Sequence, residues 1–145
     1  MFRENLIIFF DILTILLLIN VSYSDIRRRI IENKIVVILC FILIMLTWLK
    51  YETIFILTPI CVLLIGFLLF SLKVIGGGDV KLIAALTLSL PNDQIPSLFF
   101  FITLSGLLVI IWGFLFHRKS ITNNGVPYGV AISLGYLVNM FLYST

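Results

Sequence analysis

Two aspartates, Asp25 and Asp79, stand beside long apolar segments, where a charged side chain is costly. Asp25 follows the apolar run 6–23, and Asp79 immediately precedes the run 80–90. An ionisable residue at membrane depth is expensive, so both aspartates are candidate functional residues. Taken singly, Asp25 could instead cap the next helical segment or pair with the arginines that follow it.

Brought within a few ångströms of each other, two carboxyl groups cannot both ionise easily, so they share a proton. The ionised partner can then take a proton from a water molecule that attacks a peptide carbonyl. The protonated partner can hydrogen-bond to that carbonyl and later protonate the leaving amine. Such a pair titrates as one unit rather than as two separate groups. Paired aspartates therefore indicate acid–base hydrolysis of a peptide bond.

Three successive glycines, Gly76, Gly77 and Gly78, come directly before Asp79. Glycine lacks a Cβ atom and reaches backbone conformations closed to other residues. We therefore expect a loop that lets Asp79 approach Asp25 and leaves space for the backbone of a substrate. The alternative is a flexible turn between two helices, with an aspartate at the membrane interface.

The composition is that of a membrane protein. Of the 145 residues, 61% are hydrophobic and 12% are charged, with a mean hydropathy of +1.22. A soluble domain usually has about 25% charged residues. Almost the whole chain is needed for membrane spans, so we expect residues 1–145 to form a single membrane-embedded domain. Cys40 and Cys61 both lie inside apolar runs and predict neither a metal site nor a disulfide framework.

Apolar runs divide the chain into about six expected membrane helices. The runs cover residues 6–23, 35–49, 53–72, 80–90, 95–116 and 126–143, with a polar loop at 120–125. Asp11 interrupts the first run, and we expect it near the outer end of that span or in a polar contact inside the bundle. A signal peptide cleaved after Ser24 is the alternative for this segment, but Asp11 would break its apolar core.

Basic residues predict how these helices are oriented. Lys and Arg concentrate in cytoplasmic loops. The first, third and fifth loops hold eight of them: Arg27, Arg28, Arg29, Lys34, Lys73, Lys81, Arg118 and Lys119. The opposite side holds two, Arg3 and Lys50. Both termini are therefore expected outside, with Asp25, Asp79 and the segment Pro127-Tyr128-Gly129 at the cytoplasmic face. Because orientation explains the net charge of +3, we expect no nucleic-acid partner.

Three segments together resemble those of a known family. Gly76-Gly77-Gly78-Asp79 fits the Gly-x-Gly-Asp signature of intramembrane aspartyl proteases. Asp25, a basic stretch and then Ile31-Glu32-Asn33 resemble the Asp…Ile-Pro-Asn element of the type IV prepilin peptidases. Residues 126–132 are similar to the Pro-Tyr-Gly-x-Ala-Ile segment of that family. The segments follow the family order, and Glu32 departs from the pattern where the family usually has proline.

The resemblance implies an all-α, polytopic membrane protease in which Asp25 and Asp79 are the catalytic pair. Gly76, Gly77 and Gly78 would form the active-site loop. Supporting roles would fall to Asn33, Lys81, Pro127, Tyr128 and Gly129. No metal or other cofactor is expected.

The implied substrates are prepilin-like proteins, cut at the cytoplasmic face of a bacterial or archaeal membrane between a basic leader and an apolar helix. Pilus or secretion machinery is a possible further partner. Many large family members carry a cysteine-rich insert in the first loop, and they also N-methylate the new terminus. The first loop here has only about ten residues and no cysteine, so neither a zinc site nor methyltransferase activity is expected. The small size is most similar to the peptidases of tight-adherence (Flp-type) pili.

A second class of function stays open beside the protease. The chain could be a non-catalytic membrane component of a pilus or secretion assembly, or a small transporter. A transporter should show polar residues along several spans near the bilayer midplane. In this sequence the unusual polar segments are expected at one face, which favours the protease.

Overall fold

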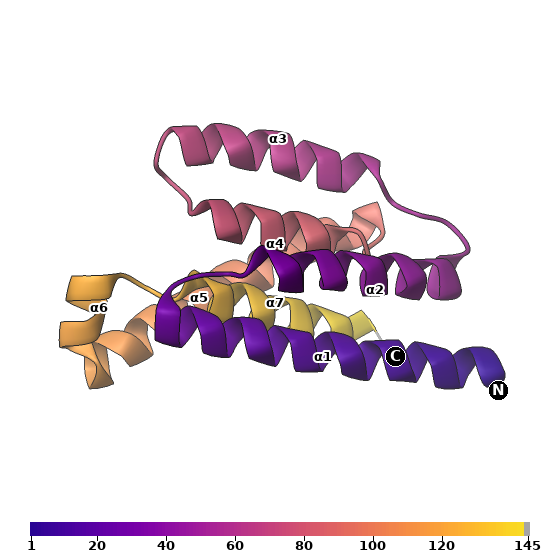
Figure 1. Cartoon of the computed structure of the whole chain (residues 1–145), viewed down its shortest axis with the longest axis horizontal. Helices are drawn as coiled ribbons and strands as arrows, with labels where there is room; N and C mark the ends of the chain where they lie inside the picture. Colours follow the sequence, from indigo (N-terminus) through magenta and orange to yellow (C-terminus); the bar gives the residue numbers. More distant parts are fainter. Residues whose placement is uncertain (144–145) are drawn as a thin grey trace.

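The computed structural model describes residues 1–143, apart from the side chains of residues 120 and 121, and within this range it contains helices and no strand (Figure 1). The helices are α1 (Phe2–Arg28), α2 (Asn33–Tyr51), α3 (Leu57–Ser71), α4 (Gly77–Thr87), α5 (Ile95–Phe116), α6 (Arg118–Asn124) and α7 (Tyr128–Tyr143), with a 3-10 helix at Asn92–Gln94. The expectation of an all-α fold is confirmed.

The lengths of the helices suit a membrane protein. Within the part of the chain that the structure describes, three segments, Phe2–Arg28, Asn33–Tyr51 and Asn92–Phe116, are long and apolar enough to cross a bilayer, and α3 and α7 are shorter apolar helices. Helix α4 has 11 residues, fewer than the about 20 that one span needs. Leu, Ile and Phe side chains are exposed along the helices. Such a surface suits lipid rather than water, so the chain is a polytopic membrane protein.

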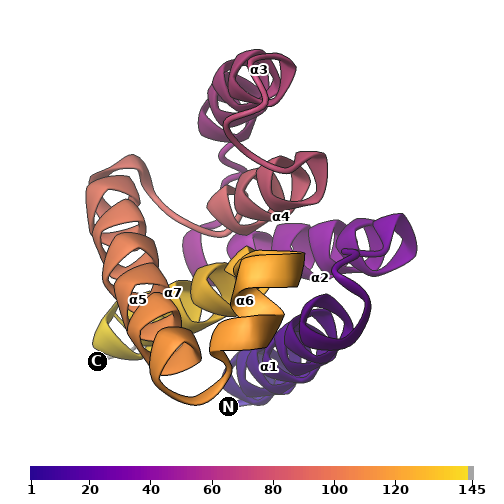
Figure 2. The ribbon, with the colours of Figure 1, turned by 90° about the vertical axis from the view of Figure 1, so that its left-hand side faces the viewer.

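The core lies where α1, α2, α4 and α7 meet. Leu18, Leu43, Leu86 and Ile132 are buried there, one from each of these helices. Helix α5 packs along α7, whereas α3 packs chiefly on α4 and lies apart from the others (Figure 2). The buried residues within α3 are Pro59 and Gly66. Gly66 faces Val80 so closely that a Cβ atom would collide with it, as is usual where membrane helices pack through small residues.

Two boundaries differ from the sequence-based expectation. Helix α1 continues through the expected first loop to Arg28, so only residues 29–32 connect it to α2 and Asp25 lies on the helix itself. Arg27 and Arg28 lie in its last turn, where positive charge complements the helix dipole. The expected polar loop at 120–125 is wrong, because most of it belongs to the short helix α6.

The connections that follow α1 and α3, together with α6, lie at one end of the molecule, on the left in Figure 1. The end of α1 and the beginnings of α4 and α7 therefore come together there. These three segments carry Asp25, Asp79 and Gly129.

Candidate active site

Asp25 is buried near the end of α1 and is held by the first turn of α7. The residue is 7% exposed, and its Oδ2 accepts a hydrogen bond of 2.7 Å from the backbone N–H of Gly129. The unpaired N–H groups of a helix N-terminus carry partial positive charge, which favours a negative group. Asp25 therefore caps α7, rather than the helix that follows it in the sequence.

Position 129 has no room for a side chain larger than that of glycine. A Cβ atom there would lie 2.8 Å from Oδ2 and 3.0 Å from Cγ of Asp25. Any larger residue would push the carboxylate away from the helix end. Gly129 was expected to support the site, and the structure gives it a direct contact with Asp25.

Arg29 and Val130 surround the same carboxylate. The Arg29 guanidinium interacts electrostatically with Asp25, and the backbone N–H of Val130 is a second donor near it. Arg29 ends α1 in the left-handed region, with φ 56° and ψ 32°, where non-glycine residues are uncommon. The Ser24 hydroxyl donates to the carbonyl of Ile30 at 2.9 Å and ties the short connection back onto α1.

Asp79 lies in the first turn of α4, before the apolar run 80–90, and is partly buried. Burial first, and then the nearby negative charge of Asp25, raise the pKa of the Asp79 carboxyl from 3.8 to about 6. The fold therefore brings the two aspartates within electrostatic reach, although 54 positions separate them in the sequence (79 − 25). Two carboxyl groups within electrostatic reach can share one proton, which is the arrangement needed to donate and accept protons in turn.

The glycine stretch differs from the expected loop. Gly76 caps α4 with φ −70° and ψ 140°, and Gly77 and Gly78 are already helical. Among the described glycines, positive φ occurs at Gly125, so conformational freedom is not what these three positions need. They need space, because added Cβ atoms would lie 3.0 Å from Oδ2 of Asp79 at Gly76, 3.3 Å from Phe70 at Gly77 and 3.2 Å from Ile31 at Gly78.

The remaining residues expected to support the site lie in two places, one at α4 and the start of α2 and the other at the start of α7. Lys81 donates to Oδ1 of Asn33 at 3.1 Å, so these two tie α4 to the start of α2. Lys81 follows Asp79 by two positions and points from the opposite face of α4. Pro127 accepts a hydrogen bond from the N–H of Val130 at 3.2 Å and shapes the turn into α7. Tyr128 is 49% exposed.

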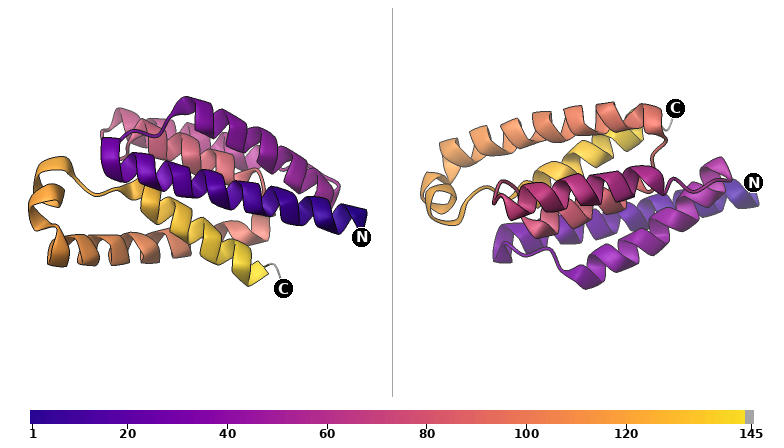
Figure 3. Two further views of the ribbon diagram at one scale, coloured as in Figure 1. Left: turned by 60° about the horizontal axis from the view of Figure 1, so that its bottom comes forward. Right: turned by 90° about the horizontal axis from the view of Figure 1, so that it is seen from above.

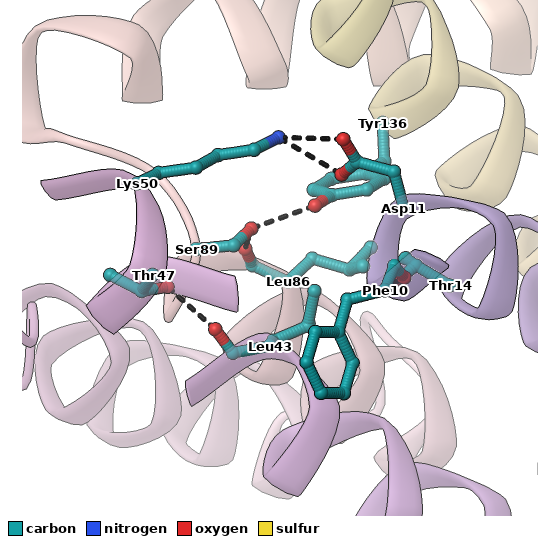
Figure 4. Close-up of polar contacts among 9 residues, drawn as sticks. All are labelled: Phe10, Asp11, Thr14, Leu43, Thr47, Lys50, Leu86, Ser89 and Tyr136. Carbon is teal, nitrogen blue, oxygen red and sulfur yellow. Dashed lines mark hydrogen bonds and ion pairs between the residues drawn. The ribbon is translucent and has the colours of Figure 1, made fainter. Parts of the chain in front are cut away.

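A second polar cluster lies away from this site (Figure 4), and it contains the polar contact that was one of the two expectations for Asp11. Lys50 binds both carboxylate oxygens of Asp11, at 2.9 and 3.0 Å. The hydroxyls of Ser89 and Tyr136 lie 2.8 Å apart in the same region. Polar residues are therefore not confined to one face. The expectation from the sequence, that they would all lie at one face, is wrong. The signal was Asp11 itself, a carboxylate inside an apolar run, which required a partner of opposite charge.

Among the residues that the structure describes, no three His, Cys, Asp or Glu side chains gather as a metal site would require. The fold and the neighbouring carboxyl groups define a helical membrane protein with a candidate acid–base pair. A family model described as the type IV leader peptidase family matches residues 12–114, and the chain belongs to that family. It is therefore a peptidase-like membrane protein.

The matched region contains both Asp25 and Asp79 but ends before Gly129. No match was found among the curated proteins or among the solved structures. The contact of Gly129 with Asp25 is therefore known from the structure of this chain and not from the family match.

Proposed function

We propose that this chain is a membrane aspartic endopeptidase that removes the leader from prepilin-like proteins at the cytoplasmic face. The observation that supports the proposal is the electrostatic interaction between the carboxyl groups of Asp25 and Asp79 at one end of the helical bundle. Membership of the type IV leader peptidase family supplies the class of reaction.

The two aspartates have different surroundings, which gives each a role. We assign Asp25 as the base, because the N–H of Gly129 donates to its carboxylate and the positive Arg29 guanidinium interacts with it. Asp79 is the acid, since burial and the charge of Asp25 favour its protonated form.

In the proposed reaction, Asp25 takes one proton from a water molecule as the water oxygen bonds to the scissile carbonyl carbon. Asp79 meanwhile hydrogen-bonds to the carbonyl oxygen. When the C–N bond breaks, a carboxyl proton passes to the leaving amine. The products are a carboxylic acid and an amine, and the pair returns to its singly protonated state.

The substrates we propose have a short basic leader followed by an apolar helix. The exposed apolar surface of α5 and α7 suits a partner that is itself in the bilayer. We further propose that residues 1–145 act as a single domain in a bacterial or archaeal membrane, that pilus or secretion machinery is the setting, and that the chain cleaves without metal or cofactor and does not methylate its product.

The proposal is tested with a tagged pilin-like protein from a neighbouring gene, co-expressed with this chain and followed by a cleavage blot. Asp25→Asn and Asp79→Asn should each lower the rate by roughly 10²–10⁴-fold, the range for an acid–base group. The double variant should be no worse than either single one.

Two acidic residues outside the pair serve as controls. Asp93 is exposed, and Glu32 pairs with Arg28 at 3.1 Å on the surface. Asp93→Asn and Glu32→Gln should leave cleavage near the original rate. If Asp25→Asn at normal abundance in the membrane still cleaves like the unaltered protein, the assignment of the pair is wrong.

A further inference from the structure

A groove of about 610 Å³ is lined by residues of α1, α5 and α7. Most of its lining is apolar and includes Leu108, Trp112 and Leu115 from α5 and Leu134 from α7. Figure 3 shows α7 starting beside the end of α1 and crossing toward the beginning of α5. Trp112 is 63% and Leu115 73% exposed, so the groove is open to whatever surrounds the helices.

One end of this groove lies next to the contact between Asp25 and Gly129. Ile26 and Val130 line it, and each directly follows one partner of the hydrogen bond between Asp25 and Gly129. A molecule lying in the groove would therefore end next to the residues that hold the Asp25 carboxylate.

Arg29 lines the same end and carries an unsatisfied donor. Its Nη1 is buried and has no hydrogen-bond partner among the described residues. A buried donor without an acceptor is costly, and the carbonyl oxygens of an incoming peptide would relieve that cost. Arg29 also occupies the left-handed region, with φ 56°, where glycine would fit with less strain.

A second apolar groove, of about 440 Å³, lies between α2, α3 and α4 but faces away from the pair. On α4 its lining is Lys81, Ala84, Ala85 and Leu88. These residues share one face of the helix, and Asp79 belongs to the opposite face. A peptide in this second groove would not reach the carboxylates directly.

We propose that the groove between α1, α5 and α7 receives the apolar helix of the substrate, with Arg29 donating to the main chain beside the scissile bond. This inference rests on the proposed function and adds where the substrate lies. A peptide suits the position better than a phospholipid does, because a lipid phosphate would meet the negative charge of Asp25. Main-chain carbonyls are neutral acceptors, and an apolar helix offers side chains to Leu108, Trp112 and Leu134.

Photo-crosslinking locates the substrate. A photoreactive amino acid replaces either Trp112 in the proposed groove or Leu63 in the second groove, both of them exposed to the surroundings. Each is placed in the Asp79→Asn background, so that the substrate is not cleaved. The probe is the tagged pilin-like protein used for the cleavage blot. We expect a crosslinked product from position 112 and little from position 63.

The outcomes separate this inference from the proposed function. Cleavage by the unaltered chain together with crosslinks mainly from position 63 refutes binding of the substrate in the proposed groove but supports the peptidase activity. Crosslinks from position 112 without any cleavage by the unaltered chain support binding in the groove and contradict the proposed peptidase activity. Crosslinks from position 112 only to phospholipid, or only to a second copy of this chain, overturn the groove as well.

Arg29 is tested as a positioning residue by Arg29→Gly, which suits the left-handed backbone and should keep the fold. Loss of a charged hydrogen bond should weaken substrate binding roughly tenfold, seen as a higher KM and a lower crosslink yield from position 112. Arg28→Gln removes the neighbouring charge, which pairs with Glu32 on the surface, and should change neither value. Unchanged KM and crosslink yield in Arg29→Gly would refute the role of Arg29.

Discussion

The backbone N–H of Gly129 donates to Oδ2 of Asp25 at 2.7 Å, across 104 positions of sequence. This bond sets the N-terminus of α7 on the carboxylate near the end of α1. It gives Asp25 a fixed orientation and a neighbouring positive dipole, while Asp79 has the charge of Asp25 beside it. The two carboxyl groups are thereby made unequal, which an acid–base pair needs.

The first prediction concerns Gly129→Ala. The new Cβ would lie 2.8 Å from Oδ2 of Asp25, so the carboxylate must move. Displacement of a reacting group by about 1 Å can cost roughly 10²-fold in rate, and we expect a loss of that order in the cleavage assay. Gly106→Ala is the matched control, since its Cβ would lie 3.8 Å from that of Ala131. Full activity in Gly129→Ala would show that the contact is unimportant.

The second prediction concerns Gly78→Val. A Cβ at position 78 would lie 3.2 Å from Cβ of Ile31, and the valine methyl groups would increase the crowding. We expect cleavage to fall while the protein still inserts, because α4 and its Asp79 shift away from α1. Ile31→Ala should restore part of the activity in the double variant. Equal damage with and without Ile31→Ala would mean that crowding at Ile31 is not the cause.

The sequence was sufficient for the helical class and for several boundaries. The run 95–116 coincides with helix α5, Ile95–Phe116, because its uninterrupted apolar residues and its polar flanks leave little choice. The common location of Asp25, Asp79 and residues 127–129 also followed from alternating helices and loops. What the sequence could not provide was the hydrogen bond to Gly129, which depends on how α7 crosses α1.

The reason for the glycines was also beyond the sequence. Glycine is selected either by an unusual backbone or by a close neighbour, and the residue type alone does not distinguish the two. Gly78 faces Ile31 in the connection between α1 and α2, a contact known only once α4 is placed. Similarly, Asp11 lies in the first apolar run and Lys50 directly follows the second, and their pairing required α1 and α2 to lie side by side.

The third prediction concerns this ion pair. Asp11 and Lys50 have side chains that are 22% and 25% exposed, between an exposed pair, worth about 1 kcal/mol or less, and a buried one, where losing a partner costs about 3–5 kcal/mol. Asp11→Asn should lower the unfolding temperature in detergent, because the Lys50 ammonium loses its counter-charge. Glu4→Gln, at a position where the side chain is 80% exposed, is the control and should leave it unchanged. An unaltered unfolding temperature in Asp11→Asn would contradict a stabilising role.

The last prediction concerns orientation in the membrane. The end that holds the proposed site carries eight of the ten Lys and Arg residues, and Arg3 and Lys50 lie elsewhere. Basic loops stay in the cytoplasm. Single cysteines at Asn123 in α6 and at Asp93 between α4 and α5 should therefore label from opposite sides, in a chain with Cys40→Ala and Cys61→Ala. Asp93→Cys should react with a membrane-impermeant thiol reagent in intact cells, and Asn123→Cys only after the membrane is opened. Labelling of both in intact cells would place Asp25 and Asp79 away from the cytoplasm, where a leader still attached to a newly made protein could not reach them.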